Sequence, residues 1–301
     1  MINEDYISII VAVKNEEKRI RECILSLLNQ RLSPDLFDIV VVDGLSDDNT
    51  LNIIKDISIK YSNRIRVYIN KKELQSSGRN IGIRNSPNSK FIAYIDGHCI
   101  ADEDWLYYLY SELIKRGDDV AGVGSVVINP KDESYFGRII NSIFQSVIGG
   151  YGSSYQNTKI IKIVNTSPFA LYRKSVLENI NLYDESLMYG EDYDLNMRIK
   201  KEGYKLYVNP LAKVQYYKRK NISSFIKQMY NYGMGKAINF KKYKFEMGFL
   251  PIFPFILFMI YFLTGIEEYL TNNFHFTNYL TIIYISLILL SSATIVIKEK
   301  S

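Results

Sequence analysis

A short apolar run that ends abruptly in polar side chains is the feature that most constrains this chain. Residues 90–95 read Lys-Phe-Ile-Ala-Tyr-Ile, which is the composition and length of a buried strand. Asp96, Gly97 and His98 follow at once. Such a strand delivers a carboxylate and an imidazole to the carboxyl edge of a sheet, where open α/β sheets bind their ligands. The sequence therefore predicts a ligand-binding corner at Asp96 and His98.

The same corner has the chemistry of a metal site. A carboxylate and an imidazole that point into one pocket can hold Mn²⁺ or Mg²⁺ together with a diphosphate. Gly97 between them allows the backbone to come close to the ligand. Alternatively, Asp96 caps the following helix and His98 is an ordinary loop residue with its hydrogen bonds satisfied. Both interpretations stay open at this point.

Apolar runs of strand length alternate with helical patterns in the first part of the chain. Strands are predicted at 6–13, 38–42, 65–69 and 120–128, and Asn15 is the predicted cap of the helix after the first strand. This alternation predicts an α/β fold with a doubly wound, mostly parallel sheet. With 301 residues the chain has room for one large domain or two small ones.

The turn after the first strand excludes two common phosphate-binding devices. Residues 11–20 contain no glycine, so neither the dinucleotide-binding glycine fingerprint nor a P-loop is present. Any phosphate must then be held by a metal ion or by cationic side chains. The two cysteines, Cys23 and Cys99, are too few for a zinc site or a disulfide framework, which fits a reducing cytosolic setting.

Two adjacent carboxylates, Glu191 and Asp192, stand just before apolar residues at helical spacing. The dipole at the amino end of a helix favours negative charge, so we expect both to be ionised. Taken alone, they are more simply explained as capping residues than as catalysts.

The carboxyl-terminal part of the chain differs in kind. Residues 249–266 and 279–297 are uncharged apolar stretches, each long enough at about 1.5 Å per residue to cross most of a ~30 Å hydrocarbon core. They predict a transmembrane helical hairpin within residues 249–301. Lysines flank its outer ends and the connector holds two glutamates, so a multi-pass protein of the cell membrane with its α/β domain in the cytoplasm is expected. Pro251 and Pro254 leave open a re-entrant or interfacial first segment.

A basic segment precedes the predicted hairpin. From Gly203 to Phe245 there is no Asp or Glu, while Lys and Arg recur, so an anionic partner is expected. Residues 216–248 are predicted to form a basic juxtamembrane or interfacial helical segment, which faces anionic headgroups or the pyrophosphate of a lipid-linked acceptor. Nucleic acid would also suit a basic, aromatic segment, but the neighbouring hairpin argues against that partner.

Five short motifs lie within residues 1–215. They read Ile-Val-Ala-Val-Lys-Asn-Glu-Glu (10–17), Val-Val-Asp-Gly-Leu-Ser-Asp-Asp-Asn-Thr (41–50), Gly-Arg-Asn-Ile-Gly (78–82), Asp-Gly-His (96–98) and Gly-Glu-Asp-Tyr-Asp-Leu (190–195). In this order and spacing the set resembles the family 2 glycosyltransferases. The resemblance implies a GT-A-like catalytic domain over residues 1–215, a nucleotide-sugar donor, a divalent cation and inversion at the anomeric carbon.

The resemblance also implies roles for individual residues. Asp192 matches the general base, Asp43 the carboxylate that reads the nucleotide base, and Arg79 the stretch placed against base and phosphate. Asp96 matches the first Asp of the Asp-x-Asp motif, which serves ribose and cation. His98 replaces the second Asp, the usual metal ligand. Imidazole can ligate Mn²⁺ but supplies no negative charge, so this departure affects metal affinity and identity.

Val13, Asn15 and Glu191 belong to the same motifs and are also expected at the nucleotide sugar. The base is expected to be uracil because Asp43 can accept a hydrogen bond from a base N–H, a requirement that guanine also meets. Processive synthases of the family carry Gln-x-x-Arg-Trp. Here Gln228 is followed by Met-Tyr-Asn-Tyr, which favours transfer of one sugar per encounter.

The sequence therefore leads to the hypothesis of a membrane-anchored, inverting glycosyltransferase. It would move one hexose or N-acetylhexosamine from a nucleotide sugar to a lipid-linked glycan at the cytoplasmic face. Two alternatives remain: a polyprenyl-phosphate sugar synthase, or a catalytically inactive membrane scaffold that binds nucleotide sugars, as the replacement at His98 would allow.

Overall fold

A sheet of nine strands lies at the centre of the protein. The computed structural model describes residues 5–130, 132–145, 158–218, 221–247, 253–271 and 277–286. The strands are β1 (Ile7–Val13), β2 (Phe37–Asp43), β3 (Ile65–Ile69), β4 (Phe91–Tyr94), β5 (Cys99–Ala101), β6 (Val120–Ile128), β7 (Lys162–Ile163), β8 (Leu171–Arg173) and β9 (Lys205–Tyr216).

Nine α-helices, labelled α1 to α9, and two short 3₁₀ helices accompany these strands. The α-helices are α1 (Ile20–Leu28), α2 (Thr50–Lys60), α3 (Gln75–Arg84), α4 (Trp105–Ile114), α5 (Tyr135–Gln145), α6 (Lys174–Asn179), α7 (Glu191–Lys201), α8 (Ile222–Tyr243) and α9 (Phe253–Thr271). The 3₁₀ helices are η1 (Pro34–Leu36) and η2 (Lys244–Met247). Residues 277–286 are also helical.

The sheet is parallel in its first half and mixed in its second. Its order is β3-β2-β1-β4-β8-β6-β9-β5, with β7 paired to β9. The first four strands run parallel, and Ile10 stands opposite Val40 on one side and Tyr94 on the other. Beyond them, β8 pairs antiparallel with β4 and β6, while β9 pairs parallel with β6 and antiparallel with β5 and β7. The α/β prediction is confirmed, and the prediction of a mostly parallel sheet is wrong beyond β4.

The length of the strands explains this error. The predicted runs of the first half and β6 are long and apolar, so their pattern is visible in the sequence. In contrast, β5, β7 and β8 have only two or three residues each, too few for any periodicity to show. The 12-residue strand β9 was not predicted either, because its exposed and buried positions do not alternate regularly.

Helices cover the sheet on both sides of its apolar strands. Helix α3 packs against β1 and β2, and α4 packs against β6 and β9. Gly82 of α3 allows the closest approach, because a Cβ atom there would lie 2.6 Å from Cγ2 of Ile10 in β1. A residue without a side chain at such a position allows a helix to pack directly on a strand.

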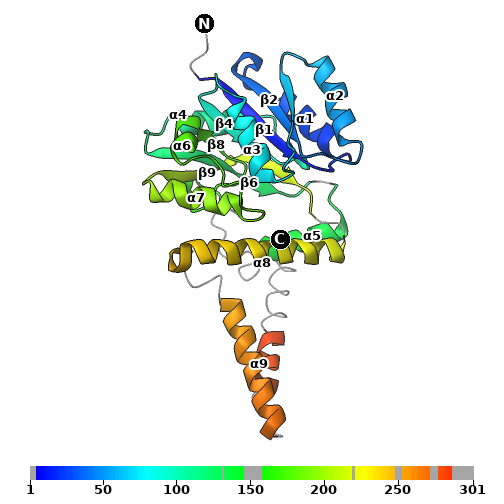
Figure 1. Ribbon diagram of the computed structural model, residues 1–301, viewed down its shortest axis with the longest axis vertical. Helices are drawn as coiled ribbons and strands as arrows, with labels where there is room; N and C mark the ends of the chain where they lie inside the picture. The colour runs from blue at the N-terminus through cyan, green and yellow to red at the C-terminus, as the bar shows by residue number, and fades with distance from the viewer. Residues whose placement is uncertain are drawn as a thin grey trace.

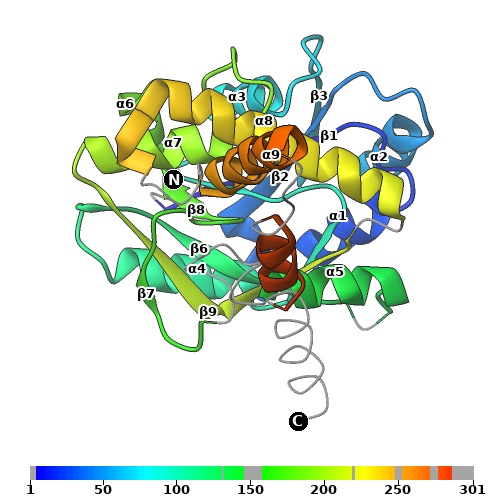
Figure 2. The same cartoon turned by 90° about the horizontal axis from the view of Figure 1, so that it is seen from below.

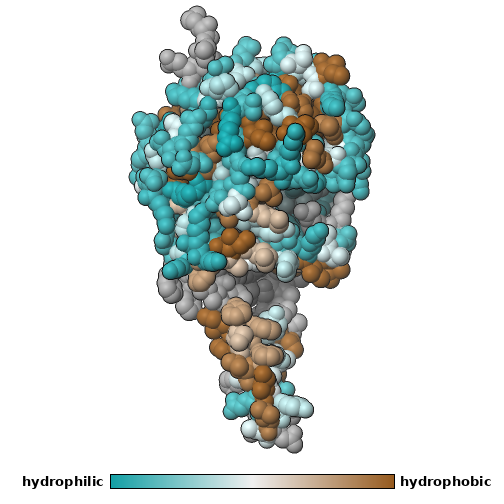
Figure 3. Space-filling view, in the orientation of Figure 1, coloured by the Kyte–Doolittle hydropathy of each residue, from teal (hydrophilic) through white to brown (hydrophobic). Residues whose placement is uncertain are grey.

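Helix α8 lies across the base of the α/β domain, and α9 projects away from it (Figures 1 and 2). The surface of the domain is largely hydrophilic, whereas much of the surface of the projecting stem is apolar (Figure 3). Among the described residues, no helix combines the length and the apolar character needed to cross a membrane. The predicted segment 249–266 is described from residue 253 and the segment 279–297 only to residue 286, and their remainders lie outside the described residues. The hairpin stays a prediction.

We expect Gly82→Ala to lower the free energy of unfolding by about 1–3 kcal/mol, because the added methyl group overpacks the contact with Ile10. Gly233→Ala is the matched control, since a Cβ at this second helical glycine meets nothing within 4 Å. The control is expected to be neutral or stabilising by up to ~1 kcal/mol. Chemical unfolding of both variants checks this, and equal effects would show that α3 does not pack on β1 as described.

Candidate active site

The guanidinium of Arg79 is the centre of the site. The Arg79 side chain, on α3, is only 3% exposed and forms ion pairs with three carboxylates. Its NH1 group contacts Asp192 and lies 3.4 Å from Oε1 of Glu191, and its NH2 group lies 3.4 Å from Oδ1 of Asp96. The first turn of α7 and the end of β4 therefore meet on one cation. The structure thus brings Asp96 and Asp192 together on Arg79.

Two aromatic rings complete the surroundings of this arginine. The Arg79 guanidinium carbon lies 4.4 Å from the ring centroid of Tyr94 and 5.2 Å from that of Tyr183. Burial disfavours the cation, but the surrounding negative charges outweigh it, with Asp192 the largest contributor, so the pKa of Arg79 is well above its ordinary value. Arg79 is therefore a permanent, immobilised positive charge.

Glu191 is not ionised as readily as the sequence suggested. Burial and, next, the negative charge of Asp192 raise the pKa of Glu191 to about 7, although Arg79 acts in the opposite direction. The expectation that the helix dipole keeps both carboxylates ionised is therefore wrong for Glu191, because desolvation is the stronger effect. The Asp192 side chain is 44% exposed, so it contacts Arg79 while remaining open to solvent.

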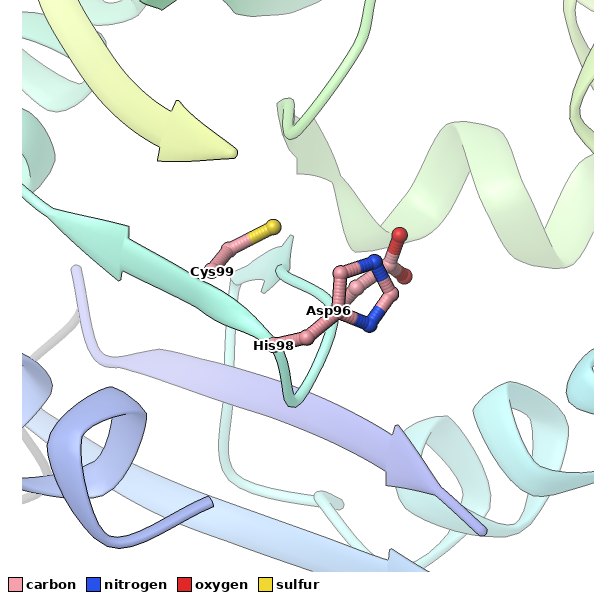
Figure 4. Close-up of side chains that lie close together, drawn as sticks. All are labelled: Asp96, His98 and Cys99. Atoms are coloured by element: carbon pink, nitrogen blue, oxygen red, sulfur yellow. The ribbon is translucent and has the colours of Figure 1, made fainter. Parts of the chain in front are cut away.

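Asp96 and His98 lie together in the turn between β4 and β5 (Figure 4). Oδ1 of Asp96 also accepts a hydrogen bond of 2.7 Å from Nε2 of Gln75. Nδ1 of His98 lies 2.9 Å from Oε1 of Glu16, which fixes the orientation of the imidazole ring. One possible ligand atom from each of Asp96, His98 and Cys99 lies within 4.8 Å of the others.

The donor set of this corner fits a divalent cation that is shared with a diphosphate. Asp96 offers a carboxylate oxygen and His98 a ring nitrogen, and both types of atom are ligands of Mn²⁺. Cys99 does not fit: it is fully buried, and burial raises the pKa of its thiol well above the ordinary range, so it stays protonated. With two protein ligands, most of the coordination sphere has to come from the bound substrate and water.

Gly97 is required for the packing of this turn. A Cβ atom at Gly97 would lie 2.5 Å from Cγ1 of Val13, the last residue of β1. Val13 therefore occupies the side of Gly97 on which a Cβ would stand. Val13 is 7% exposed, and its carbonyl accepts a 2.8 Å hydrogen bond from the N–H of Gly44. Val13 therefore packs against the turn that carries Asp96 and His98 and connects this turn to the end of β2.

Asn15 and Asp43 build a second wall next to this corner. Asp43 is fully buried at the end of β2, and its two carboxylate oxygens accept hydrogen bonds of 3.0 Å and 2.6 Å from the N–H and hydroxyl of Ser46. The N–H of Asn15 donates to the same hydroxyl at 2.9 Å. The prediction of Asn15 as a helix cap is wrong: α1 begins at Ile20, and Asn15 has a left-handed φ of 57° in the preceding turn.

The sequence did not mark Glu16, Gln75, Tyr94 or Tyr183 as site residues. Gln75 had a weak signal, because it precedes Arg79 by one helical turn and side chains at this spacing share a face. Glu16 directly follows Asn15, the predicted cap of a helix that in fact begins later in the chain. Tyr94 lies inside an apolar stretch whose pattern indicates only burial, and Tyr183 lies in a mostly polar segment with no pattern that indicates a site.

Comparison with known proteins identifies the family of this chain. The model of the family described as "Glycosyl transferase family 2" matches residues 8–180. A Methanococcus voltae protein is 32% identical over 302 aligned residues, with 98% of this chain and 89% of the relative covered. It is named a dolichyl N-acetyl-alpha-D-glucosaminyl phosphate 3-beta-D-2,3-diacetamido-2,3-dideoxy-beta-D-glucuronosyltransferase.

Solved structures share the fold at lower identity. A fragment of S. aureus TarS in complex with UDP-GlcNAc superposes with a TM-score of 0.53 at 20% identity, over 72% of this chain and 60% of that one. GalNAc-T7 with UDP, GalNAc and Mn²⁺ gives 0.56 at 18% identity, over 72% and 44% of the two chains. These likenesses establish a GT-A-like arrangement of the mixed sheet.

We expect Arg79→Met to destabilise the protein by about 3–5 kcal/mol, because three carboxylates then lose their shared counter-charge in a buried setting. Arg84→Met on the same helix is the control. Its side chain is 61% exposed and pairs with Glu185, so its loss is expected to cost no more than about 1 kcal/mol. Urea unfolding measures both, and similar values for the two variants would contradict the central role of Arg79.

Proposed function

Since this chain belongs to glycosyl transferase family 2 and is a glycosyltransferase, we propose that it transfers one sugar, with inversion, from a nucleotide sugar to a lipid-linked acceptor. The observation that carries the proposal is the junction at Arg79. There, one guanidinium contacts Asp192, the candidate base, and Asp96, a candidate metal ligand. A donor bound at Asp96 would therefore present its reacting carbon near Asp192.

In this proposal Asp192 is the general base. Its carboxylate is partly exposed and accepts the proton of the acceptor hydroxyl as that oxygen attacks the anomeric carbon. The new bond forms on the face opposite the nucleoside diphosphate, whose bond to the sugar breaks. Arg79 holds the Asp192 carboxylate in place and counteracts the burial that raises the pKa of Asp192. Glu191, with its raised pKa, contributes a hydrogen-bonding group near the sugar.

The donor is proposed to lie between the two walls of the site. Asp96 and His98 would hold a divalent cation, Mn²⁺ or Mg²⁺, which supplies positive charge for the departing diphosphate. The nucleotide base would lie toward Val13, Asn15 and Asp43. Because Ser46 donates to both oxygens of Asp43, we propose that this carboxylate shapes the base pocket chiefly through the Ser46 loop.

The sugar and acceptor are proposed by chemistry and by likeness. The TarS fragment binds UDP-GlcNAc, which supports a UDP-linked hexose or N-acetylhexosamine as donor. The Methanococcus voltae relative is named for transfer to a dolichyl-linked N-acetylglucosamine phosphate, which favours a lipid that already carries sugar over bare polyprenyl phosphate. We further propose attachment to the cell membrane through residues 249–266 and 279–297, with the catalytic domain in the cytoplasm. The flanking lysines support this orientation.

We expect Asp192→Asn to fold normally and bind donor, but to lose transfer by about 10²–10⁴-fold, because it cannot accept the acceptor proton. Sugar transfer to a lipid extract measures the activity, and thermal stabilisation by UDP-sugars with Mn²⁺ measures donor binding. Asp56→Asn, on the exposed side of α2, is the control and should behave like wild type.

Wild-type turnover by Asp192→Asn would remove the assignment of the base. Wild-type protein that is stabilised by UDP-sugars, yet neither transfers nor hydrolyses them with any cation, would instead indicate the inactive scaffold.

A further inference from the structure

Helices α5 and α8 form a joint layer at the base of the domain. The ring of Phe225 in α8 packs edge-on against Phe136 and Phe144 of α5, at centroid distances of 6.5 Å and 6.4 Å. The stem formed by α9 leaves the molecule from this same base (Figure 1).

Both helices expose large apolar side chains at four-residue spacing. In α5, Tyr135, Ile139 and Ile143 are 75%, 41% and 40% exposed. The corresponding residues of α8 and their exposures are Ile222 (66%), Ile226 (60%), Tyr230 (67%) and Met234 (40%). A spacing of four residues places each set along one side of its helix. Two adjacent apolar stripes of this kind mark an interaction surface.

The stripe of α8 faces away from the catalytic domain. Nine residues are two and a half helical turns, so Ile226 lies on the side opposite Gly235, and Tyr230 on the side opposite Asn239. Gly235 and Asn239 are the residues by which α8 packs on the start of α7. The stripe is therefore turned toward the surroundings of the protein.

The charge of the two helices indicates which kind of partner binds to this surface. Helix α8 contains four lysines, α5 contains one arginine, and neither contains an acidic residue. An apolar stripe with basic flanks suits a bilayer interface that contains anionic lipids. We propose that α5 and α8 form a lipid-binding face that lies in the headgroup region of an anionic membrane. The proposal extends the proposed function, from which it takes the membrane location.

Site-specific fluorescence tests this lipid-binding face on the full chain. A dye is attached after Ile226→Cys or, as control, after Ile59→Cys, since Ile59 is 77% exposed on α2 and the native Cys23 and Cys99 are fully buried. The protein is added to phosphatidylcholine vesicles with or without phosphatidylglycerol. At position 226 we expect several-fold stronger quenching by headgroup-nitroxide lipids than at position 59, protection from iodide, and weakening of both effects without phosphatidylglycerol.

Two outcomes would overturn the proposal. Iodide access at position 226 equal to that at position 59 would show an uncovered surface. Protection from iodide without quenching by the nitroxide lipid would show that protein, such as a second copy of this chain, covers it. Sugar transfer measured on the same vesicles separates the proposals, because an active enzyme with either outcome loses only the lipid-binding face.

The inner side of α8 holds the turn that starts α7. Gly190 has a φ of +79°, and Asn239 of α8, 1% exposed, donates from Nδ2 to the Gly190 carbonyl at 2.9 Å. A Cβ atom at Gly190 would lie 2.4 Å from that nitrogen. The buried side-chain amide of Asn239 therefore fixes the backbone that precedes Glu191 and Asp192.

Helix α8 also contacts the first turn of α7 through the side chain of Asp194. This carboxylate is fully buried and accepts from Nε of Arg198 at 2.8 Å. It also accepts from Tyr243 and Lys242 of α8, each at 2.5 Å. Helix α8 thus holds the first turn of α7 at two points.

We infer that Asn239 is a positioning residue for Asp192 in the proposed reaction. It touches neither donor nor acceptor and acts through Gly190, whose place determines where the Asp192 carboxylate lies. A displacement of about 1 Å at a reacting group can cost on the order of 10²-fold in rate, so loss of this amide should affect turnover more than donor binding.

The test is Asn239→Leu, with Asn239→Ala as a second variant that leaves room for water and Asn231→Leu on the same helix as control. We expect kcat per folded molecule to fall by about 10–10²-fold in both Asn239 variants, with an unchanged donor KM. The control should keep wild-type values. An unchanged kcat in either folded Asn239 variant, or a fall matched by the control, would overturn the inference, whereas an inactive wild type would overturn the proposed function.

Discussion

A buried arginine with three carboxylate partners is the interaction on which the site depends. Removing Arg79 and its partners from water is costly unless each charge is matched, so the three segments that carry them must meet in one arrangement. The start of α7 is far in sequence from helix α3 and the end of β4, yet this requirement fixes the relative positions of all three. Burial also affects protonation, because desolvation of Glu191, followed by the negative charge of Asp192, raises the pKa of Glu191 to about 7.

Sequence reasoning was most successful where residues follow long apolar strands. The runs that became β1, β2 and β4 end at Val13, near Asp43 and before Asp96, and a parallel sheet places all three ends on one edge. The meeting of Asp96 with Asp192 required the family motifs, since no local pattern connects residues so far apart. Periodicity could not reveal the short strands, nor that Asn15 belongs to a turn and not to a helix.

Tertiary packing determines the surroundings of Glu191 and Gly97, which their neighbours in the sequence do not show. Local rules treat Glu191 as a helix-terminal acid and Gly97 as a place for a ligand to approach, because they consider only neighbours in the sequence. In the structure, burial in the Arg79 cluster outweighs the helix dipole at Glu191, and the methyl group of Val13 occupies the space beside Gly97. Both outcomes depend on tertiary packing.

Helix α8 contacts α7 through Asn239, Lys242 and Tyr243. These contacts limit where the polypeptide can be shortened. A boundary drawn at residue 215, the predicted end of the GT-A-like domain, would separate the helix that carries Asp192 from its support and uncover the Asp194 carboxylate. A shortened, water-soluble form of the enzyme that retains its native site would have to extend through Tyr243.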